Sequence, residues 1–270
     1  MKRKTYLAGA IAGDVIGSVY EFDNIKTKDF PLFHPMCEYT DDTVMTLALA
    51  KTLSEMENRE DLEEFKLAYV QNMHFVFRLY PDMSYGGRFL RWLEEGRTTP
   101  YNSCGNGSAM RVSAVGWYAN TLEEAERLAK ASAEVTHNHP DGIAGAVATA
   151  GAVFLARTGA TKERIREYVS GYYPLDFTLA EIRPDYEFNE VCCGTVPQAV
   201  VAFLEAEDFE DAIRNVISIG GDSDTLGAIT GAIAEAYYGI PEELEQTALS
   251  YLDDYLLDLA ESFAETLPQE

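Results

Sequence analysis

Glycine recurs at every fourth position in two distant parts of the chain, and this spacing restricts the fold more than any other feature. Gly9, Gly13 and Gly17 would lie on one face of a helix, and Gly227 and Gly231 would do the same in a second helix. A face without side chains allows another backbone to approach closely. We therefore expect two tightly packed helices near the centre of the fold.

The rest of the chain follows helical periodicity, and no stretch alternates apolar and polar residues over strand length. The pattern predicts helices at 43–56, 62–79, 87–95, 122–135, 143–156, 161–169, 196–205, 209–219 and 249–267, with irregular segments at 24–39 and 171–189. Thr121 and Asp208 are the expected N-caps of two of these helices. Since no linker-like segment interrupts the chain, we expect one all-α domain over residues 1–270.

The N-terminal segment has a basic start, Lys2-Arg3-Lys4, followed by a mostly apolar run from Thr5 to Ala12, in the order of a signal peptide. Asp14 interrupts this short run, and the helical pattern continues beyond it. We therefore interpret the segment as an uncleaved first core helix. If that helix reached Glu21, the carboxylates of Asp14 and Glu21 would share one face.

Two clusters of hydroxyl and carboxylate side chains precede helical runs. They are Thr40-Asp41-Asp42-Thr43 and Gly220-Gly221-Asp222-Ser223-Asp224-Thr225. Each could be a simple N-cap, because Ser, Thr and Asp are preferred there and acidic side chains suit the first helical turn. One cap needs one oxygen, however, and each cluster supplies at least three. If the clusters met in the fold, their four carboxylates would repel each other unless cations lay between them.

Two divalent ions about 3.5–4 Å apart would satisfy such an arrangement, as in two-metal hydrolases. Both clusters offer hard oxygen ligands, which favours Mg²⁺ or Mn²⁺ over zinc. The formal charge of −24 argues against electrostatic binding to nucleic acid or to an anionic membrane, and no apolar run has transmembrane length. The four cysteines include no C-x-x-C pair, and we interpret them as reduced thiols of a cytoplasmic protein.

Two further segments could contribute to a site. The glycine-rich run Cys104-Gly105-Asn106-Gly107-Ser108-Ala109-Met110-Arg111 could bind phosphate through free backbone N–H groups, although a plain turn is the commoner explanation. His137 and His139 precede a Pro-Asp-Gly turn, where hydrogen-bonded loop histidines are commoner than metal ligands.

Taken together, these motifs resemble those of the ADP-ribosylglycohydrolase family. They are Gly13-Asp14-x-x-Gly17-x-x-Tyr20-Glu21, Thr40-Asp41-Asp42-Thr43, Gly105-Asn106-Gly107-Ser108-x-Met110-Arg111, Thr136-His137 and Gly220-Gly221-Asp222-Ser223-Asp224-Thr225. The resemblance spans residues 9–241 and implies a compact orthogonal helical bundle. It also implies a cleft holding two Mg²⁺ or Mn²⁺ ions, and ADP-ribose conjugates as substrates, cleaved at the anomeric carbon.

The resemblance also assigns roles to individual residues. The implied metal ligands are Thr40, Asp41, Asp42, Asp222, Asp224 and Thr225. Asn106, Gly107 and Ser108 are expected along the ADP-ribose, with His137 and the backbone of Gly142 near the diphosphate. We expect Glu21, Asp41 and Asp224 to be catalytic, with Glu21 as the base or gate near the metals.

One departure from the family pattern concerns the general base. Some relatives carry an acidic residue just before the Asn-Gly-Ser segment, whereas Tyr101, Asn102, Ser103 and Cys104 stand there in this chain. Glu21 is therefore the candidate base by default. Two alternatives to the hydrolase are an ADP-ribose-binding protein of the same fold without activity and a two-metal phosphoesterase acting on a nucleotide.

Overall fold

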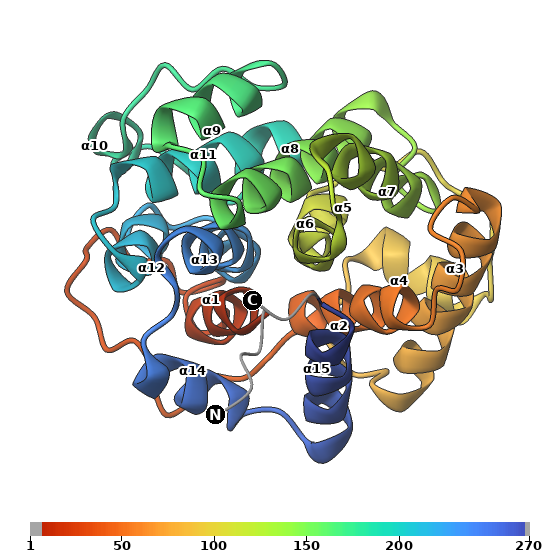
Figure 1. Ribbon diagram of the computed structural model, residues 1–270. Helices are drawn as coiled ribbons and strands as arrows, with labels where there is room; N and C mark the ends of the chain where they lie inside the picture. Colours follow the sequence, from red (N-terminus) through yellow and green to blue (C-terminus); the bar gives the residue numbers. More distant parts are fainter. Residues whose placement is uncertain (1–6, 268–270) are drawn as a thin grey trace.

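The computed structural model describes residues 7–267, which form fifteen helices and no strand (Figure 1). In chain order the helices are α1 Ala8–Ser18, α2 Asp41–Ser54, α3 Leu62–Leu79, α4 Gly87–Glu94, α5 Gly107–Met110, α6 Ser113–Tyr118, α7 Leu122–Glu134, α8 Pro140–Arg157, α9 Lys162–Ser170, α10 Leu179–Ile182, α11 Cys192–Glu205, α12 Phe209–Ile217, α13 Ser223–Tyr238, α14 Glu242–Leu249 and α15 Asp254–Thr266. The expected all-α fold is confirmed.

Side-chain oxygens start several helices by accepting backbone N–H groups that have no partner within the helix. The Thr121 hydroxyl accepts from Glu124 N and the Asp208 carboxylate accepts from Asp211 N, so both expected N-caps are confirmed. Helices α2, α3, α9, α10 and α15 begin with caps of the same kind.

Helices α1 and α13 pack backbone to backbone, as the glycine spacing predicts. A Cβ atom on Gly13 would overlap the Gly227 carbonyl, and a Cβ atom on Gly17 would lie 2.6 Å from Asp224 Cα. Because the later residue of α1 faces the earlier residue of α13, the two helices run antiparallel. The end of α1 therefore lies beside the beginning of α13, where the second acidic cluster stands.

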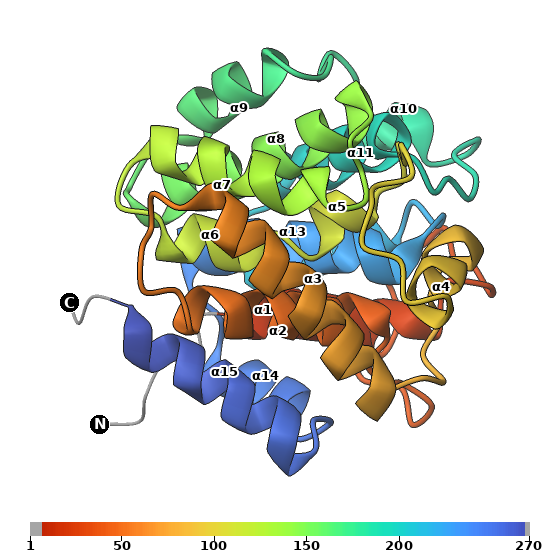
Figure 2. The same ribbon diagram turned by 90° about the vertical axis from the view of Figure 1, so that its right-hand side faces the viewer.

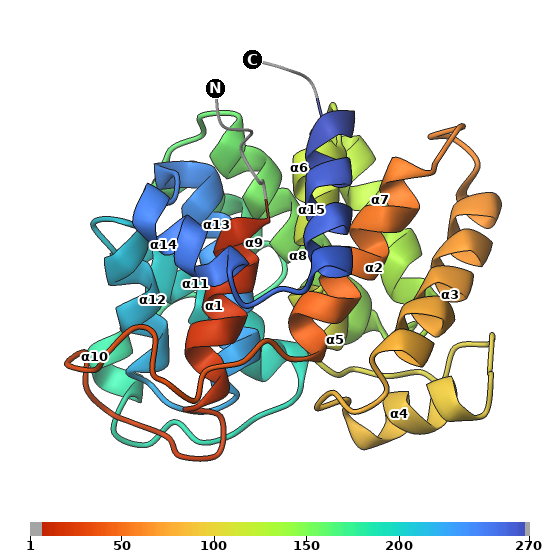
Figure 3. The ribbon, with the colours of Figure 1, turned by 90° about the horizontal axis from the view of Figure 1, so that it is seen from below.

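Helix α13 lies at the centre of the molecule, with every residue from Ser223 to Glu235 buried. Figure 2 shows the layers around it, with α9 outermost on one side and α14 and α15 on the other. Between them lie α7, α8 and α11, then α13 with α5 and α6, and then α1, α2 and α3. In Figure 3 the connection from α1 to α2, helix α4 and the segment after α10 share one end of the molecule.

Two sequence-based expectations about helix ends are wrong. The predicted helix at 249–267 begins only at Asp254, because Asp253 caps it by accepting from Leu256 N. Leu249 is instead the last residue of a separate helix, α14, which was not predicted. Helix α1 ends at Ser18, so Asp14 and Glu21 do not share a helix face. Beyond that end the Asn24 side-chain amide donates to the carbonyls of Tyr20 and Glu21, in place of helical N–H groups.

The first core helix is present from Ala8 onward, while residues 1–6, which include the basic start of the signal-like run, lie outside the described residues. Among residues 7–267, no helix combines the length and the hydrophobicity that a membrane span requires.

Candidate active site

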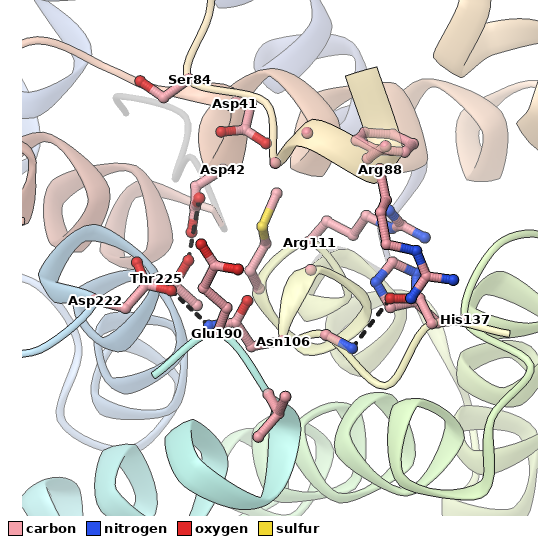
Figure 4. A pocket seen from close by; sticks show the side chains of 18 of the residues that line it. Asp41, Asp42, Ser84, Arg88, Asn106, Arg111, His137, Glu190, Asp222 and Thr225 are labelled. Atoms are coloured by element: carbon pink, nitrogen blue, oxygen red, sulfur yellow. Dashed lines mark hydrogen bonds between the residues drawn. The ribbon is translucent and has the colours of Figure 1, made fainter. Parts of the chain in front are cut away.

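The two acidic clusters meet at one end of the fold. The Thr225 hydroxyl at the start of α13 donates to Asp42 Oδ2 at the start of α2 over 3.3 Å. Carboxylate oxygens of Glu21, Asp222 and Asp224 lie within 4.8 Å of one another. All of these side chains, together with Asp41, line a cavity of about 530 Å³, which is within the usual size range of small-molecule sites. Figure 4 shows several of them around the cavity.

Asp14 joins the first acidic cluster to the central helix pair. Its fully buried carboxylate accepts hydrogen bonds from the backbone N of Thr40 and of Thr43, each at 3.0 Å, and from both hydroxyls. The carboxylate thus satisfies N–H groups at the start of α2 that have no partner within the helix. An acid inside a glycine-rich apolar helix was the sequence signal for this contact.

The second cluster stands on a sharp turn that needs glycine. Gly220 and Gly221 have φ angles of 69° and 87°, a backbone conformation that favours residues without a Cβ. The Asn24 side chain fixes this turn by accepting from Gly221 N at 2.7 Å and donating to Gly221 O at 3.0 Å. The connection after α1 therefore holds Asp222 in position.

Burial and mutual repulsion favour the protonated forms of these acids. Burial, followed by the neighbouring carboxylates, raises the pKa of Asp41, Asp42 and Asp224 well above its ordinary value. Burial raises the pKa of Asp222 to about 6, and burial with the Asp224 carboxylate raises the pKa of Glu21 to about 8. Positive charge at this end of the cavity would reverse these shifts.

The donor set fits a hard divalent cation. It consists of carboxylate and hydroxyl oxygens, which are the ligands that Mg²⁺ and Mn²⁺ prefer. Asp42 Oδ1 is buried and has no hydrogen-bond partner among residues 7–267, and such an orphaned oxygen is costly unless something binds it. Thr40 does not line the cavity; its hydroxyl donates to Asp14 Oδ1 over 2.8 Å.

The glycine-rich segment borders the acidic cluster. Gly105, Asn106 and Gly107 line the cavity, and the Asn106 amide donates to Asp222 Oδ2 at 2.7 Å and to Thr195 Oγ1 at 3.1 Å. The Asn106 side chain therefore connects the second acidic cluster to α11.

Ser108 and Gly142 lie behind this wall and do not line the cavity. The buried Ser108 hydroxyl donates to the Gly142 carbonyl over 2.6 Å. A Cβ atom on Gly142 would lie 2.7 Å from the Ser103 carbonyl oxygen and 2.9 Å from His137 Cβ. In the structure both residues brace the glycine-rich segment against α8.

His137 lines the far end of the cavity, while His139 does not. His137 Nδ1 lies 2.7 Å from the Thr136 hydroxyl, and burial, with Arg111 and Arg88 nearby, holds the pKa of His137 well below its usual value. His137 is therefore neutral at physiological pH. His139 instead caps α8, because its Nδ1 accepts from Asp141 N at 3.1 Å.

Several cavity residues were missed by sequence reasoning. Arg88 and Arg91 come from α4 and form a basic wall, while Phe188 and Glu190 come from the segment before α11. Glu190 adds to the pKa rise of Glu21, so it is a second acid near the candidate base. The expected irregular segment at 171–189 was the only sequence signal for this part of the wall. Figure 4 shows the labelled carboxylates on one side of the cavity and His137 with the arginines on the other.

The chain is similar to known ADP-ribosylhydrolases and glycohydrolases. The chain is 27% identical to ADP-ribosylhydrolase ARH3 of Mus musculus, over 89% of this chain and 85% of that protein. It is 27% identical to the ADP-ribosyl-[dinitrogen reductase] glycohydrolase of Rhodospirillum rubrum, over 91% and 88% of the two chains. ADP-ribosylarginine hydrolase Tri1 of Pseudomonas putida (strain GB-1) is 25% identical, over 99% and 79%.

Among solved structures, an ADP-ribosylglycohydrolase-related protein complex superposes with a TM-score of 0.69 at 26% sequence identity, and 97% of each chain is covered. A sequence model described as ADP-ribosylglycohydrolase matches residues 3–270. Since this match spans nearly the whole chain, the protein belongs to the ADP-ribosylglycohydrolase family of glycosidic-bond hydrolases.

Proposed function

We propose that this protein is a metal-dependent hydrolase that cleaves the glycosidic bond between ADP-ribose and an acceptor and releases ADP-ribose. The observation that carries the proposal is the meeting of both acidic clusters in one cavity whose opposite wall carries His137 and arginines. An acidic end suits cations and sugar hydroxyls, and a basic end suits a diphosphate. A two-metal phosphoesterase would share the acids but has no clear use for the glycine-rich segment.

Two divalent ions, Mg²⁺ or Mn²⁺, would be held by Asp41 and Asp42 from one side and by Asp222, Asp224 and Thr225 from the other. The Thr40 hydroxyl, which donates to Asp14 Oδ1, would have to turn away from that carboxylate to join these ligands. When bound, such ions orient ribose hydroxyls and supply an activated water. Among these residues, Asp224 would be a central ligand, because its carboxylate lies within 4.8 Å of those of Glu21 and Asp222.

Glu21 is the residue that we propose to take a proton from the attacking water. It lies beside Asp222 and Asp224 and remains partly accessible from the cavity. Its raised pKa would leave it protonated at pH 7, and nearby cations would lower that pKa and free the carboxylate to act as a base. Asp41 and Asp224 act with it by placing the reacting groups.

The glycine-rich segment and His137 would bind the rest of the ADP-ribose. Gly105, Asn106 and Gly107 run from the acidic cluster toward His137, so the distal ribose would lie at the acidic end with the diphosphate beyond it. In this assignment Ser108 and Gly142 support the subsite from behind. The relatives named above act on ADP-ribosylarginine and on ADP-ribosyl-dinitrogen reductase, and we infer a protein or small-molecule conjugate as the substrate here.

Free cysteine thiols favour a cytoplasmic location for this protein. All four cysteines are free, and Cys193 is exposed, as expected for a reducing compartment. The strong negative charge makes nucleic acid an unfavourable partner.

The decisive experiment is incubation of the protein with a panel of ADP-ribose conjugates and Mg²⁺ or Mn²⁺, with release of free ADP-ribose measured. We expect release from at least one conjugate, none in EDTA, and none from the Asp224→Asn variant. Binding of ADP-ribose without release from any conjugate would instead establish a non-catalytic binding protein.

A further inference from the structure

Arg111 is a buried guanidinium without a carboxylate partner. The residue is 1% exposed, it lines the cavity, and no ion pair joins it to an acid within the described part of the chain. The guanidinium carbon lies 5.7 Å from the Tyr69 ring centroid and 5.5 Å from that of Phe89. Arg111 Nε and Nη1 have no hydrogen-bond partner among the described residues. Aromatic faces thus hold a positive charge that no acid neutralises.

The remaining nitrogen of Arg111 starts a short hydrogen-bond chain. Arg111 Nη2 donates to Thr136 Oγ1 over 2.8 Å, and Thr136 Oγ1 lies 2.7 Å from His137 Nδ1. Thr136 is fully buried, and these two are the partners of its hydroxyl within residues 7–267.

The direction of this chain follows from the available protons. Arginine can only donate, so Thr136 Oγ1 must accept from Arg111. The hydroxyl then has one proton left, and His137 Nδ1 is the acceptor within reach. If Nδ1 carried a proton instead, the hydroxyl proton would be buried without an acceptor, which is unfavourable. His137 therefore keeps its proton on Nε2.

The protonated nitrogen faces the glycine-rich segment. His137 Nε2 lies 3.4 Å from the position that a Cβ atom would take on either Gly105 or Gly107. With no side chain at these two positions, the Nε2–H group is open to a ligand in the cavity.

We propose that Arg111 and Thr136 are positioning residues that hold His137 as the neutral Nε2–H tautomer, a fixed donor beside an uncompensated positive charge. The ligand is an anion with phosphate-type oxygens, and this part of the inference rests on the proposed function. The tautomer itself belongs to the free protein and does not depend on which bond is cleaved.

The test is ¹⁵N NMR of histidine-labelled protein with Mg²⁺, since Mn²⁺ would broaden the signals. A His137→Gln spectrum identifies the His137 signals among the four histidines. We expect one tautomer in the wild type, with a pyrrole-type Nε2 and a pyridine-type Nδ1. A wild-type spectrum with the proton on Nδ1, or with an imidazolium at pH 7, overturns the proposal.

A matched pair of variants tests the relay, by which we mean the hydrogen bonds that lead from Arg111 through Thr136 to His137. Thr136→Ser keeps the hydroxyl, so we expect the wild-type tautomer and an ADP-ribose dissociation constant within about twofold. Thr136→Val removes the hydroxyl at constant shape, so a second tautomer should appear. If only a fraction f of His137 then carries the Nε2 proton and only this form binds, the dissociation constant should rise about 1/f-fold. Arg111→Met removes the donor that fixes the rotation of the Thr136 hydroxyl, but the hydroxyl proton still needs His137 Nδ1 as its acceptor. We therefore expect less of the second tautomer in Arg111→Met than in Thr136→Val.

A Thr136→Val variant with one Nε2–H tautomer and unchanged affinity would refute the relay. If Arg111→Met does not fold, the two Thr136 variants and the wild-type spectrum still test the proposal. The correct tautomer in a protein that releases no ADP-ribose would instead count against the proposed function alone.

Discussion

In the absence of divalent cations, the free energy of unfolding of this protein should decrease as the pH rises from about 4 to 6. The reason is the buried acidic cluster, and Asp222 is the member on which the effect can be worked through. Its side chain is 6% exposed, and burial raises its pKa from 3.8 to about 6. The folded state therefore holds a proton in this pH range that the unfolded state has already lost.

The sign and size follow from proton linkage. Because the folded pKa lies above the unfolded one, the free energy of unfolding decreases with pH between the two values. The difference between 3.8 and about 6, at roughly 1.36 kcal/mol for each pH unit, corresponds to about 3 kcal/mol from Asp222 alone. Cations bound between the acids would remove this loss. A cation at 100 times its dissociation constant adds about 2.7 kcal/mol by mass action.

The assay is urea unfolding at 25 °C at several pH values from 4 to 8, in EDTA and in millimolar Mn²⁺. The matched control is Asp222→Asn, whose amide oxygen can still accept from Asn106 Nδ2. In EDTA the variant should show a smaller decrease in unfolding free energy between pH 4 and 6 than the wild type. This comparison separates Asp222 from the general effect of the −24 charge.

Two results would refute this reasoning. Identical pH profiles for wild type and Asp222→Asn in EDTA would mean that Asp222 titrates normally in the folded state. Superimposable curves in EDTA and Mn²⁺ at pH 8 would mean that no cation binds the cluster.

Three other predictions concern single substitutions. Asp224→Asn should abolish hydrolysis while the circular dichroism spectrum stays native; measurable turnover would exclude Asp224 as an essential ligand. Glu21→Gln should lower kcat at least ~10²-fold with little change in ADP-ribose affinity by calorimetry, and wild-type turnover would place the base elsewhere. Gly13→Ala should lower the unfolding free energy measured in urea by about 3 kcal/mol or more, because its Cβ meets the Gly227 backbone. The control is Gly87→Ala, whose Cβ would lie in open space. Equal stabilities of the two variants would contradict the close helix crossing.

Local features of the fold could be predicted because they depend on neighbouring residues. The helix at 62–79 has the predicted bounds, and Thr121 caps α7 as expected. A cap or an apolar stripe needs only a few residues in sequence. The break before α15 was missed because the apolar stripe continues through it, while the Asp253 cap that restarts the helix is a subtler signal.

The acidic clusters could be identified from sequence because each is a contiguous run. The glycine spacing even indicated which helices would be central. What sequence patterns left open was whether the clusters meet, since that depends on the antiparallel register of α1 and α13 and on the contact of Asp14 with the start of α2.

Only the tertiary structure decided the rest of the cavity. Arg88 and Glu190 reach it from segments without a recognisable motif, and Ser108 lies behind its wall although it directly follows Gly107, which lines it. Periodicity shows which side of a helix is buried but not which distant segment covers it. The hydrogen bonds from Arg111 through Thr136 to His137 likewise join residues up to 26 positions apart. Sequence patterns could not predict them, because the packing of separate helices, and not local propensity, sets those distances.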